Sequence, residues 1–253
     1  MLRIRVIPVL LLKNQVLVKT VNFRKPGYIG DPINTCRIFN ELEVDELSFL
    51  DITASSEKRG PNLEILKEIS SECFMPLSYG GGISSLEQAE SVFKIGFEKV
   101  ILNTASLVKP ELITEISRIF GSQAVVVAID VKKNFWGKYQ VHGLNGTENH
   151  KYDPVQWALK VEELGAGEIL LTSIDQEGTW KGFDIDLVKK VSQHCTIPVI
   201  AHGGAGSLDH IKDVVKSAGA SAVALGSLVV YQQKGMGVLV NFPDREELTK
   251  VLN

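Results

Sequence analysis

Residues 76–106 read PLSYGGGISSLEQAESVFKIGFEKVILNTAS, and the chain repeats this pattern about half its length further on. There, residues 198–228 read PVIAHGGAGSLDHIKDVVKSAGASAVALGSL. In both copies an apolar run ends at paired glycines, a Ser-Leu-acid helix start follows, and a short apolar run closes the unit. This spacing indicates an internal duplication in which each copy supplies a strand, a turn, a helix and a second strand.

The glycine pairs Gly81-Gly82 and Gly203-Gly204 come directly after the first strand of each copy. Glycine lets a backbone approach a ligand closely, and the first N–H groups of the next helix have no partner within that helix. Such a turn is typical of phosphate binding. A tight turn would explain one such pair, but two pairs in matching positions favour two phosphate sites on opposite sides of one closed barrel.

The composition is that of an ordinary globular protein. The 253 residues are 44% hydrophobic and 23% charged, and a net charge of −3 does not favour a nucleic-acid partner. Apolar runs are too short to cross a membrane and the N-terminus does not resemble a signal peptide, so we expect a cytoplasmic protein. Three cysteines lack metal-binding spacing, and we expect no metal or cofactor. A barrel of this length normally forms one domain, here residues 1–253.

Apolar runs and helix starts alternate along the whole chain. Besides the repeats, strands are expected at residues 3–12, 46–55, 124–130 and 168–179. Helices are expected at residues 33–42, 62–73, 154–164 and 245–252. A long loop at residues 22–32 is expected to serve as a lid, and a hairpin is expected over the mouth at residues 136–150. We therefore predict an α/β fold, a (β/α)8 TIM barrel with an internal two-fold half-barrel repeat.

Functional groups of such barrels lie at the carboxyl ends of the strands. Asp130 ends an otherwise apolar strand, so burial can raise its pKa and allow it to act as a general acid or base. The alternative is that Asp130 only caps the following turn. His202 precedes the second glycine pair and is a secondary candidate for substrate binding, since a single histidine is often structural. The other polar residues at strand ends are Asp51, Asn103, Thr104, Thr172, Ser173, Asp175, Glu177 and Ser227.

Four charged residues stand at the opposite ends of the strands: Arg5, Glu46, Lys99 and Glu168. Barrel interiors are normally filled by branched apolar side chains, so four charges of balanced sign at one end are unusual. They predict a ring of ion pairs across the barrel floor. Such a ring is either a structural plug or a gate on an axial channel for a small neutral molecule.

Three segments closely resemble the cyclase subunit of imidazole glycerol phosphate synthase: DELSFLDITASSEKR (residues 45–59), FGSQAVVVAID (120–130) and GAGEILLTSIDQEGT (165–179). The resemblance runs nearly end to end. It implies that a glutaminase subunit docks on the amino-terminal face of the barrel to form a heterodimer and releases ammonia from glutamine. The ammonia would cross the barrel and react at the mouth with a phosphorylated small molecule.

The resemblance also implies roles for particular residues. The gate of the family falls on Arg5, Glu46, Lys99 and Glu168. One of its two catalytic aspartates falls on Asp130. Its substrate-binding and phosphate-binding groups fall on Lys19, Gly81, Gly82, Asn103, Thr104, Thr172, Glu177, His202, Gly203, Gly204, Gly226 and Ser227, where Glu177 replaces a shorter acid and His202 replaces a serine.

The second catalytic aspartate is missing. The family pattern C-L-D-V-K near the end of the first strand reads VLLLK here (residues 9–13), so Leu11 stands where the aspartate belongs. General acid–base catalysis by one side chain is worth on the order of 10²–10⁴-fold in rate, so efficient imidazole formation is not expected.

An intact gate beneath an altered mouth resembles a side branch of the family that builds acetamidino groups on bacterial surface sugars, as in lipopolysaccharide biosynthesis, together with a glutaminase and a sugar amidotransferase. We expect ammonia transfer to a phosphorylated or nucleotide-activated sugar. Two alternatives stay open: the cyclase activity of histidine biosynthesis, and a non-catalytic ammonia conduit that activates a glutaminase.

Overall fold

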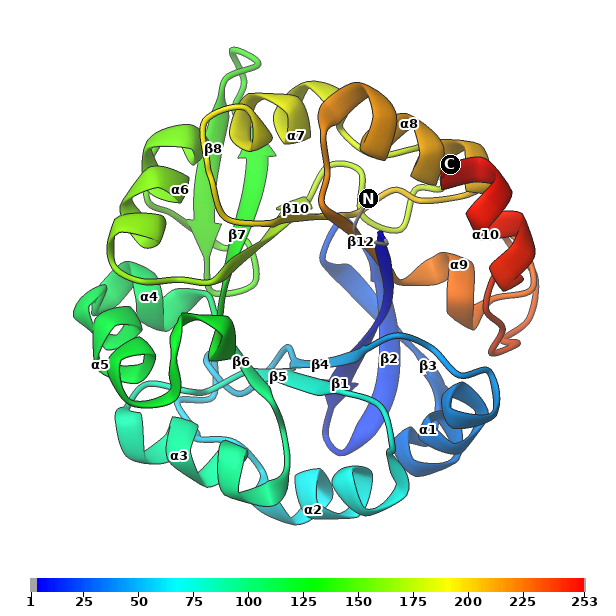
Figure 1. Cartoon of the computed structure of the whole chain (residues 1–253), viewed down its shortest axis with the longest axis horizontal. Helices are drawn as coiled ribbons and strands as arrows, with labels where there is room; N and C mark the ends of the chain where they lie inside the picture. The colour runs from blue at the N-terminus through cyan, green and yellow to red at the C-terminus, as the bar shows by residue number, and fades with distance from the viewer. Residues whose placement is uncertain (1–3, 253) are drawn as a thin grey trace.

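The computed structural model describes residues 4–252, in which eight parallel strands form a closed barrel surrounded by helices (Figure 1). In their order around the barrel the strands are β1 (Arg5–Lys13), β4 (Leu47–Asp51), β5 (Leu77–Gly80), β6 (Lys99–Leu102), β7 (Val125–Lys133), β10 (Glu168–Ser173), β11 (Val199–His202) and β12 (Ala222–Leu225). Parallel pairing of β12 with β1 and of β10 with β7 closes the ring. The predicted TIM barrel is confirmed.

The two sequence repeats occupy opposite sides of the barrel. The first comprises β5, α3 (Leu86–Ile95) and β6, and the second comprises β11, α8 (Leu208–Ala218) and β12. In both, a serine caps the helix: Ser85 accepts a hydrogen bond from the N–H of Gln88, and Ser207 accepts one from the N–H of His210. Because β5 and β11 are four strands apart in a ring of eight, the turns that follow them face each other across the mouth.

The other helices lie outside the strands. They are α1 (Pro32–Glu41), α2 (Leu63–Glu72), α4 (Thr104–Val108), α5 (Glu111–Phe120), α6 (Pro154–Glu163), α7 (Ile185–Ser192), α9 (Ser227–Val230) and α10 (Arg245–Leu252), with a short 3-10 helix, η1 (Ser122–Ala124). Side chains of Asp31, Asp153 and Asp184 cap α1, α6 and α7. Within the described residues, no helix combines the length and hydrophobicity needed to cross a membrane.

The prediction of a loop at residues 22–32 is wrong. The chain forms a hairpin of β2 (Val16–Val21) and β3 (Arg24–Gly30), and β2 also pairs antiparallel with β1. Asn22 and Phe23 both adopt left-handed backbone angles, which reverses the chain in a two-residue turn. Pro26 is tolerated because β3 is an edge strand. The hairpin tip is held across the mouth, since the N–H of Asn22 donates to the carbonyl of Glu177 at 2.9 Å.

The hairpin predicted at residues 136–150 is present, but a further antiparallel pair precedes it. β7 continues past Asp130 to Lys133 and pairs antiparallel with β8 (Tyr139–Gly143), which pairs with β9 (Glu148–Asn149). The turn between β7 and β8 projects beyond the ring of helices (Figure 1). Its aromatic pair Phe135-Trp136 is exposed. Only the turn between β8 and β9 reaches the mouth.

Two predicted strand ends also differ. β4 stops at Asp51 and β10 at Ser173, so the predicted extensions to Ser55 and Thr179 are turns. Apolar residues in these turns, such as Ile52 and Ile174, continue the apolar pattern of the strands. The sequence pattern therefore did not show where β4 and β10 end. The carbonyl of Ser173 accepts hydrogen bonds from the N–H groups of Gln176 and Glu177, which bends the chain at the mouth. The predicted start of the first strand, Arg3, lies outside the described residues, and β1 begins at Arg5.

Apolar side chains form two layers because successive side chains of a strand point to opposite faces. Along β1, Val6, Leu10 and Leu12 belong to the large layer between strands and helices. The inner layer fills the barrel with Ile7, Val9, Leu11, Val18, Ile101, Val126, Ala128, Leu170, Ile200, Ala222 and Ala224. The three alanines leave the axis less completely filled than large side chains would.

Gly204 is expected to be indispensable for stability. Its φ of +103° is unfavourable for other residues, and a Cβ atom there would lie 2.0 Å from the carbonyl oxygen of Gly182. Gly204→Ala should therefore cost about 3 kcal/mol or more of unfolding free energy in urea denaturation. The control is Gly137→Ala, where φ is +75° but no atom lies within 4 Å; it should cost only about 1 kcal/mol. Equal costs would contradict the packing argument.

Candidate active site at the mouth of the barrel

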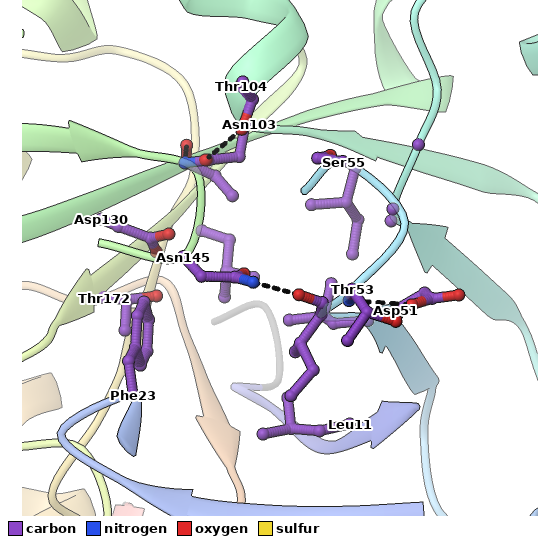
Figure 2. Close-up of a pocket in the computed structure, with 18 of the residues that line it drawn as sticks. Leu11, Phe23, Asp51, Thr53, Ser55, Asn103, Thr104, Asp130, Asn145 and Thr172 are labelled. Atoms are coloured by element: carbon purple, nitrogen blue, oxygen red, sulfur yellow. Dashed lines mark hydrogen bonds between the residues drawn. The ribbon is translucent and has the colours of Figure 1, made fainter. Parts of the chain in front are cut away.

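A cavity of about 280 Å³ opens at the carboxyl ends of the barrel strands (Figure 2). Its walls come from strands on opposite sides of the barrel: Leu11 on β1, Asp51 at the end of β4, Asp130 on β7 and Thr172 on β10. Phe23, at the tip of the β2–β3 hairpin, lines the same cavity. The lining is largely apolar with a few polar groups, as is usual for small-molecule sites.

Asp130 points into this cavity from the end of the buried run Val125–Ile129. Burial raises the pKa of its carboxyl to about 7, and a hydrogen bond from the Thr172 hydroxyl opposes part of that rise. Among the described residues Asp130 forms no ion pair. A carboxyl that titrates near neutral pH is suited to both accepting and donating a proton.

Leu11 lines the same cavity on the side opposite Asp130 (Figure 2). It pairs in register with Leu50 on β4 and with Val18 on β2, and it belongs to the inner apolar layer. Leucine has no proton to transfer and places no second carboxylate opposite Asp130. Asp130 therefore has no carboxylate at position 11 with which to form a facing acid–base pair.

The first glycine turn lies open to the cavity. Gly81 and Gly82 line it together with Asn103 and Thr104 at the end of β6. The Asn103 amide donates to the carbonyl of Ala128 at 3.0 Å, and the Thr104 hydroxyl accepts a hydrogen bond from the N–H of Leu144 at 3.0 Å. Left-handed φ values of +130° and +69° at the two glycines turn the backbone toward the cavity edge. We name these four residues the first cradle.

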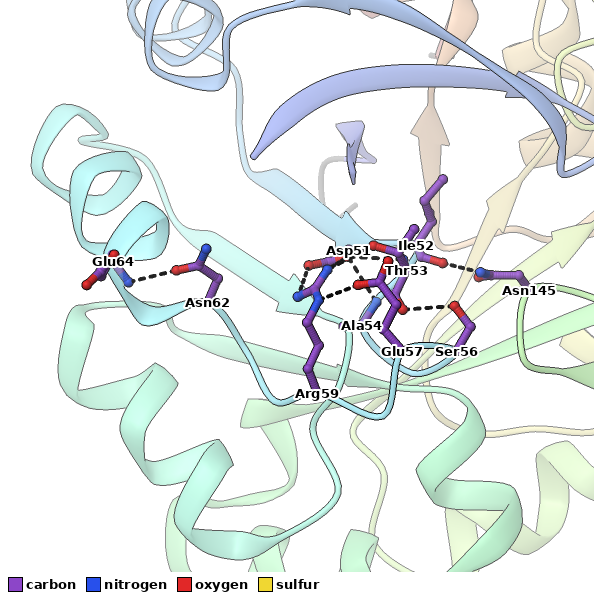
Figure 3. A network of polar contacts seen from close by, with 10 residues as sticks. All are labelled: Asp51, Ile52, Thr53, Ala54, Ser56, Glu57, Arg59, Asn62, Glu64 and Asn145. Carbon is purple, nitrogen blue, oxygen red and sulfur yellow. Dashed lines mark hydrogen bonds and ion pairs between the residues drawn. The ribbon is translucent and has the colours of Figure 1, made fainter. Parts of the chain in front are cut away.

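A polar network holds the loop that walls the first cradle (Figure 3). The Asp51 carboxylate accepts hydrogen bonds from the N–H groups of Thr53 and Ala54, and it binds the guanidinium of Arg59 through both oxygens, at 3.0 and 2.8 Å. A Cβ atom on Gly82 would lie 2.3 Å from the carbonyl of Arg59, so this loop rests on the cradle. Sequence analysis placed Asp51 at a strand end but did not identify Arg59 as its partner.

Asn145 is another residue that sequence analysis missed. It lies in the β8–β9 turn, lines the cavity, and its amide donates a hydrogen bond to the carbonyl of Ile52 across the mouth (Figures 2 and 3). The Asn-Gly pair at positions 145 and 146 marked a turn, and both Leu144 and Asn145 adopt left-handed angles there. The sequence carried no signal for which part of the mouth the turn would contact.

The second glycine turn does not reach the cavity. Gly203, Gly204, Gly226 and Ser227 are absent from its lining among the described residues. We name these four residues the second cradle. Two side chains predicted to bind substrate, Lys19 and Glu177, form a buried ion pair between it and the cavity.

His202 and Thr172 lie next to this ion pair and line the cavity. The Thr172 hydroxyl and His202 Nδ1 are hydrogen-bonded at 3.2 Å. Burial, and secondly the charge of Lys19, lower the pKa of His202 to about 3, so its imidazole is neutral at physiological pH. A neutral imidazole can hydrogen-bond a substrate but cannot supply a positive charge for a phosphate.

The four charges at the amino ends of the strands form a closed ring. Arg5 binds Glu46 at 2.7 Å and Glu168 at 2.6 Å, and Lys99 Nζ lies 2.9 Å from Glu46 and 3.1 Å from Glu168. Above the ring lies a small space of about 10 Å³, lined by Glu46, Ser48, Ser78, Ile7, Ile101, Val126, Leu170, Ile200 and Ala224. Ile101 and Leu170 also line the mouth cavity, so the two spaces share walls along the barrel axis.

The chain is similar to known proteins over almost its whole length. Residues 5–235 match the family described as histidine biosynthesis protein. A Pseudomonas aeruginosa protein, provisionally named imidazole glycerol phosphate synthase subunit hisF2, is 52% identical over 248 residues, 98% of this chain and 99% of that protein. A Leptospira borgpetersenii protein with a similar provisional name is 48% identical over 255 residues, 98% of this chain and 99% of its own. The HisF subunit of Methanococcus vannielii is 43% identical over 253 residues, 92% and 93% of the two chains.

The raised pKa of Asp130 predicts a pH-dependent penalty on stability. The unfolded chain loses this proton near pH 4, whereas the folded protein keeps it until about pH 7, so folding is penalised increasingly as pH rises through that window. Asp130→Asn removes the penalty. It should stabilise the protein by about 2 kcal/mol more at pH 8 than at pH 5, measured by urea denaturation. The exposed Asp213→Asn is the control, and an equal pH dependence in both variants would contradict the prediction.

Proposed function

The chain belongs to the histidine biosynthesis protein family as a cyclase-type subunit of an imidazole glycerol phosphate synthase-like glutamine amidotransferase, and we propose that it delivers ammonia to an acceptor other than that of histidine biosynthesis. The proposed acceptor is a phosphorylated or nucleotide-activated sugar, whose acetamido group would become an acetamidino group. One observation carries the proposal: the mouth has Leu11 opposite Asp130, while the charged floor of the barrel is complete.

The barrel floor supports the ammonia route. The ring of Arg5, Glu46, Lys99 and Glu168 satisfies each charge with two partners, and the hydroxyl groups of Ser48 and Ser78, 2.6 Å apart, provide polar atoms above it. Ammonia is small and neutral, so it can pass an apolar barrel interior that excludes ions. The ring is then a gate that opens when the ion pairs exchange partners.

The glutaminase partner would dock on the face that carries this gate. The names of the relatives describe them as synthase subunits, which supports a second subunit for this chain. Phe74 is 91% exposed in the loop between α2 and β5, at the amino ends of the strands. Exposed aromatic side chains of this kind commonly anchor protein interfaces.

At the mouth, ammonia would attack the carbon of an acetamido group whose oxygen has been activated. The activated oxygen leaves as the second C–N bond is completed, and the product is an amidine. Asp130, as a carboxylate, accepts the proton that the attacking nitrogen loses. The activation requires transfer of a phosphoryl or adenylyl group from a nucleoside triphosphate to the amide oxygen, which then departs as part of phosphate or of the nucleoside monophosphate. A sugar amidotransferase is the proposed third partner that carries out this transfer.

The histidine-pathway cyclase remains the second candidate. It is favoured by the names of relatives that are 43% identical or more, and by the open first cradle next to Asp130. A non-catalytic conduit is the third candidate, and it requires that the mouth bind no substrate.

Restoring the missing carboxylate tests the choice between the first two candidates. With ammonium salt and the bis-phosphorylated substrate of the histidine cyclase, the unmodified chain should form imidazole glycerol phosphate very slowly. Leu11→Asp should raise the rate by about 10²-fold, because it supplies a second proton-transfer group. Leu11→Asn, which has the same size but transfers no proton, is the matched control. A fast unmodified chain that also rescues a cyclase-deficient histidine auxotroph would overturn the proposal.

The docking face gives a separate prediction. Phe74→Ala should weaken binding of a glutaminase subunit of the imidazole glycerol phosphate synthase type by at least about tenfold, measured by isothermal titration calorimetry. Phe135→Ala is the matched control, since Phe135 is 93% exposed on the β7–β8 turn away from the gate. A larger loss for Phe135→Ala would place the partner on a different face.

A further inference from the structure

Lys19 and Glu177 fill the space in front of the second cradle. A Cβ atom on Gly226 would lie 2.8 Å from Lys19 Cε, 3.1 Å from Lys19 Nζ and 3.7 Å from Glu177 Oε1. Both side chains are almost completely buried, Lys19 with 5% and Glu177 with 2% exposure. The ammonium group therefore already has a carboxylate partner at the place where a bound anion would need it.

The backbone holds Glu177 firmly in this position. Its N–H donates to the carbonyl of Ser173 at 3.0 Å, and its own carbonyl accepts from the N–H of Asn22 at 2.9 Å. A Cβ atom on Gly203 would lie 3.5 Å from both the backbone nitrogen and the Cα of Glu177, so the residue is seated on the second glycine turn. These backbone contacts fix the position of the Lys19–Glu177 ion pair at the mouth.

One oxygen of this carboxylate is left without a partner. Glu177 Oε2 and the hydroxyl of Thr20 are both buried and, within the described residues, accept or donate no hydrogen bond. Both residues line the mouth cavity. A buried acceptor without a partner is costly, and a ligand group that donates a hydrogen bond would satisfy it.

The two sides of the mouth therefore differ in charge. On the first side the cavity reaches the glycine backbone directly. On the second side it meets a neutralised lysine, an unpartnered carboxylate oxygen and the neutral His202. A phosphate bound there would lose the lysine charge and face the Glu177 carboxylate across a buried, weakly screened space.

We infer that Glu177 closes the second cradle to phosphate, so that the mouth takes a substrate carrying phosphate on one side only and an uncharged hydrogen-bond donor, such as a hydroxyl or amide N–H, on the other. The inference rests on the proposed function and narrows its substrate class. It differs from the expectation of two phosphate sites, because it assigns phosphate to the first cradle alone. A nucleotide-activated acetamido sugar fits, because its phosphates lie together and its sugar ring is uncharged.

Inorganic phosphate is the probe for this inference. Backbone amide signals of Gly81 and Gly82 report the first cradle, and those of Gly203, Gly204 and Gly226 report the second, in nitrogen-15 NMR titrations of the full chain. In the unmodified protein the second-cradle signals should titrate at least tenfold more weakly than the first. Glu177→Gln frees Lys19 without changing the size of the side chain, and it should bring the two dissociation constants within about threefold of each other.

Three further variants make the outcome decisive. Glu177→Asp, which shortens the acid, should shift the second cradle in the same direction. Adding Lys19→Met to Glu177→Gln should abolish the gain, and Glu68→Gln on the exposed face of α2 should change neither cradle. Equal phosphate affinity of both cradles in the unmodified protein, or a second cradle that stays unresponsive in Glu177→Gln, would overturn the inference.

The readout involves neither glutamine, ammonia nor a partner subunit. A result that overturns this inference would therefore not contradict the proposal that the chain transfers ammonia. Conversely, a chain that proves to be the histidine cyclase would refute the proposed function whatever the two cradles bind. Comparing the dissociation constants within one chain also removes any effect of overall protein stability.

Discussion

A charge can be buried in this barrel only when an opposite charge or a good hydrogen-bond partner is buried with it. The interior is a low-dielectric layer of branched apolar side chains and alanines, where an isolated ion is costly. The floor satisfies this constraint with a closed ring of four charges, and one side of the mouth satisfies it with Lys19 and Glu177. Within residues 4–252, Asp130 has no opposite charge beside it and only the Thr172 hydroxyl as a partner, and its pKa near 7 is the consequence.

This constraint connects the two ends of the barrel. The four charges of the floor are paired with one another, whereas Asp130 at the mouth lines the cavity without a charged partner among the described residues. Leu11 leaves the opposite wall of the mouth apolar, and Glu177 leaves one side without a free positive charge. Both residues lie at the mouth, whereas the ring of four charges lies at the opposite end of the barrel.

Most of the fold could be predicted from the sequence because its signals are local. Glycine pairs, capping serines and apolar runs act within a few residues, and the duplication repeats them at the same spacing. The β2–β3 hairpin was missed because Arg24–Gly30 contains proline and glycine and is mostly exposed, so it lacks the apolar alternation of a buried strand. Asn145 was missed because nothing in a turn sequence states which part of the mouth it will contact across the barrel.

The order of residues alone was sufficient for the barrel, for the position of Asp130 directly after a buried apolar run and for the absence of an acid at Leu11. Whether the two glycine turns are equivalent depended on the folded chain. Lys19 and Glu177 are 158 residues apart, and they meet only because the β2–β3 hairpin crosses to the loop after β10. A side chain's type determines which charge it carries, but the electrostatics of a cavity depend on distances, and those exist only once the barrel has closed.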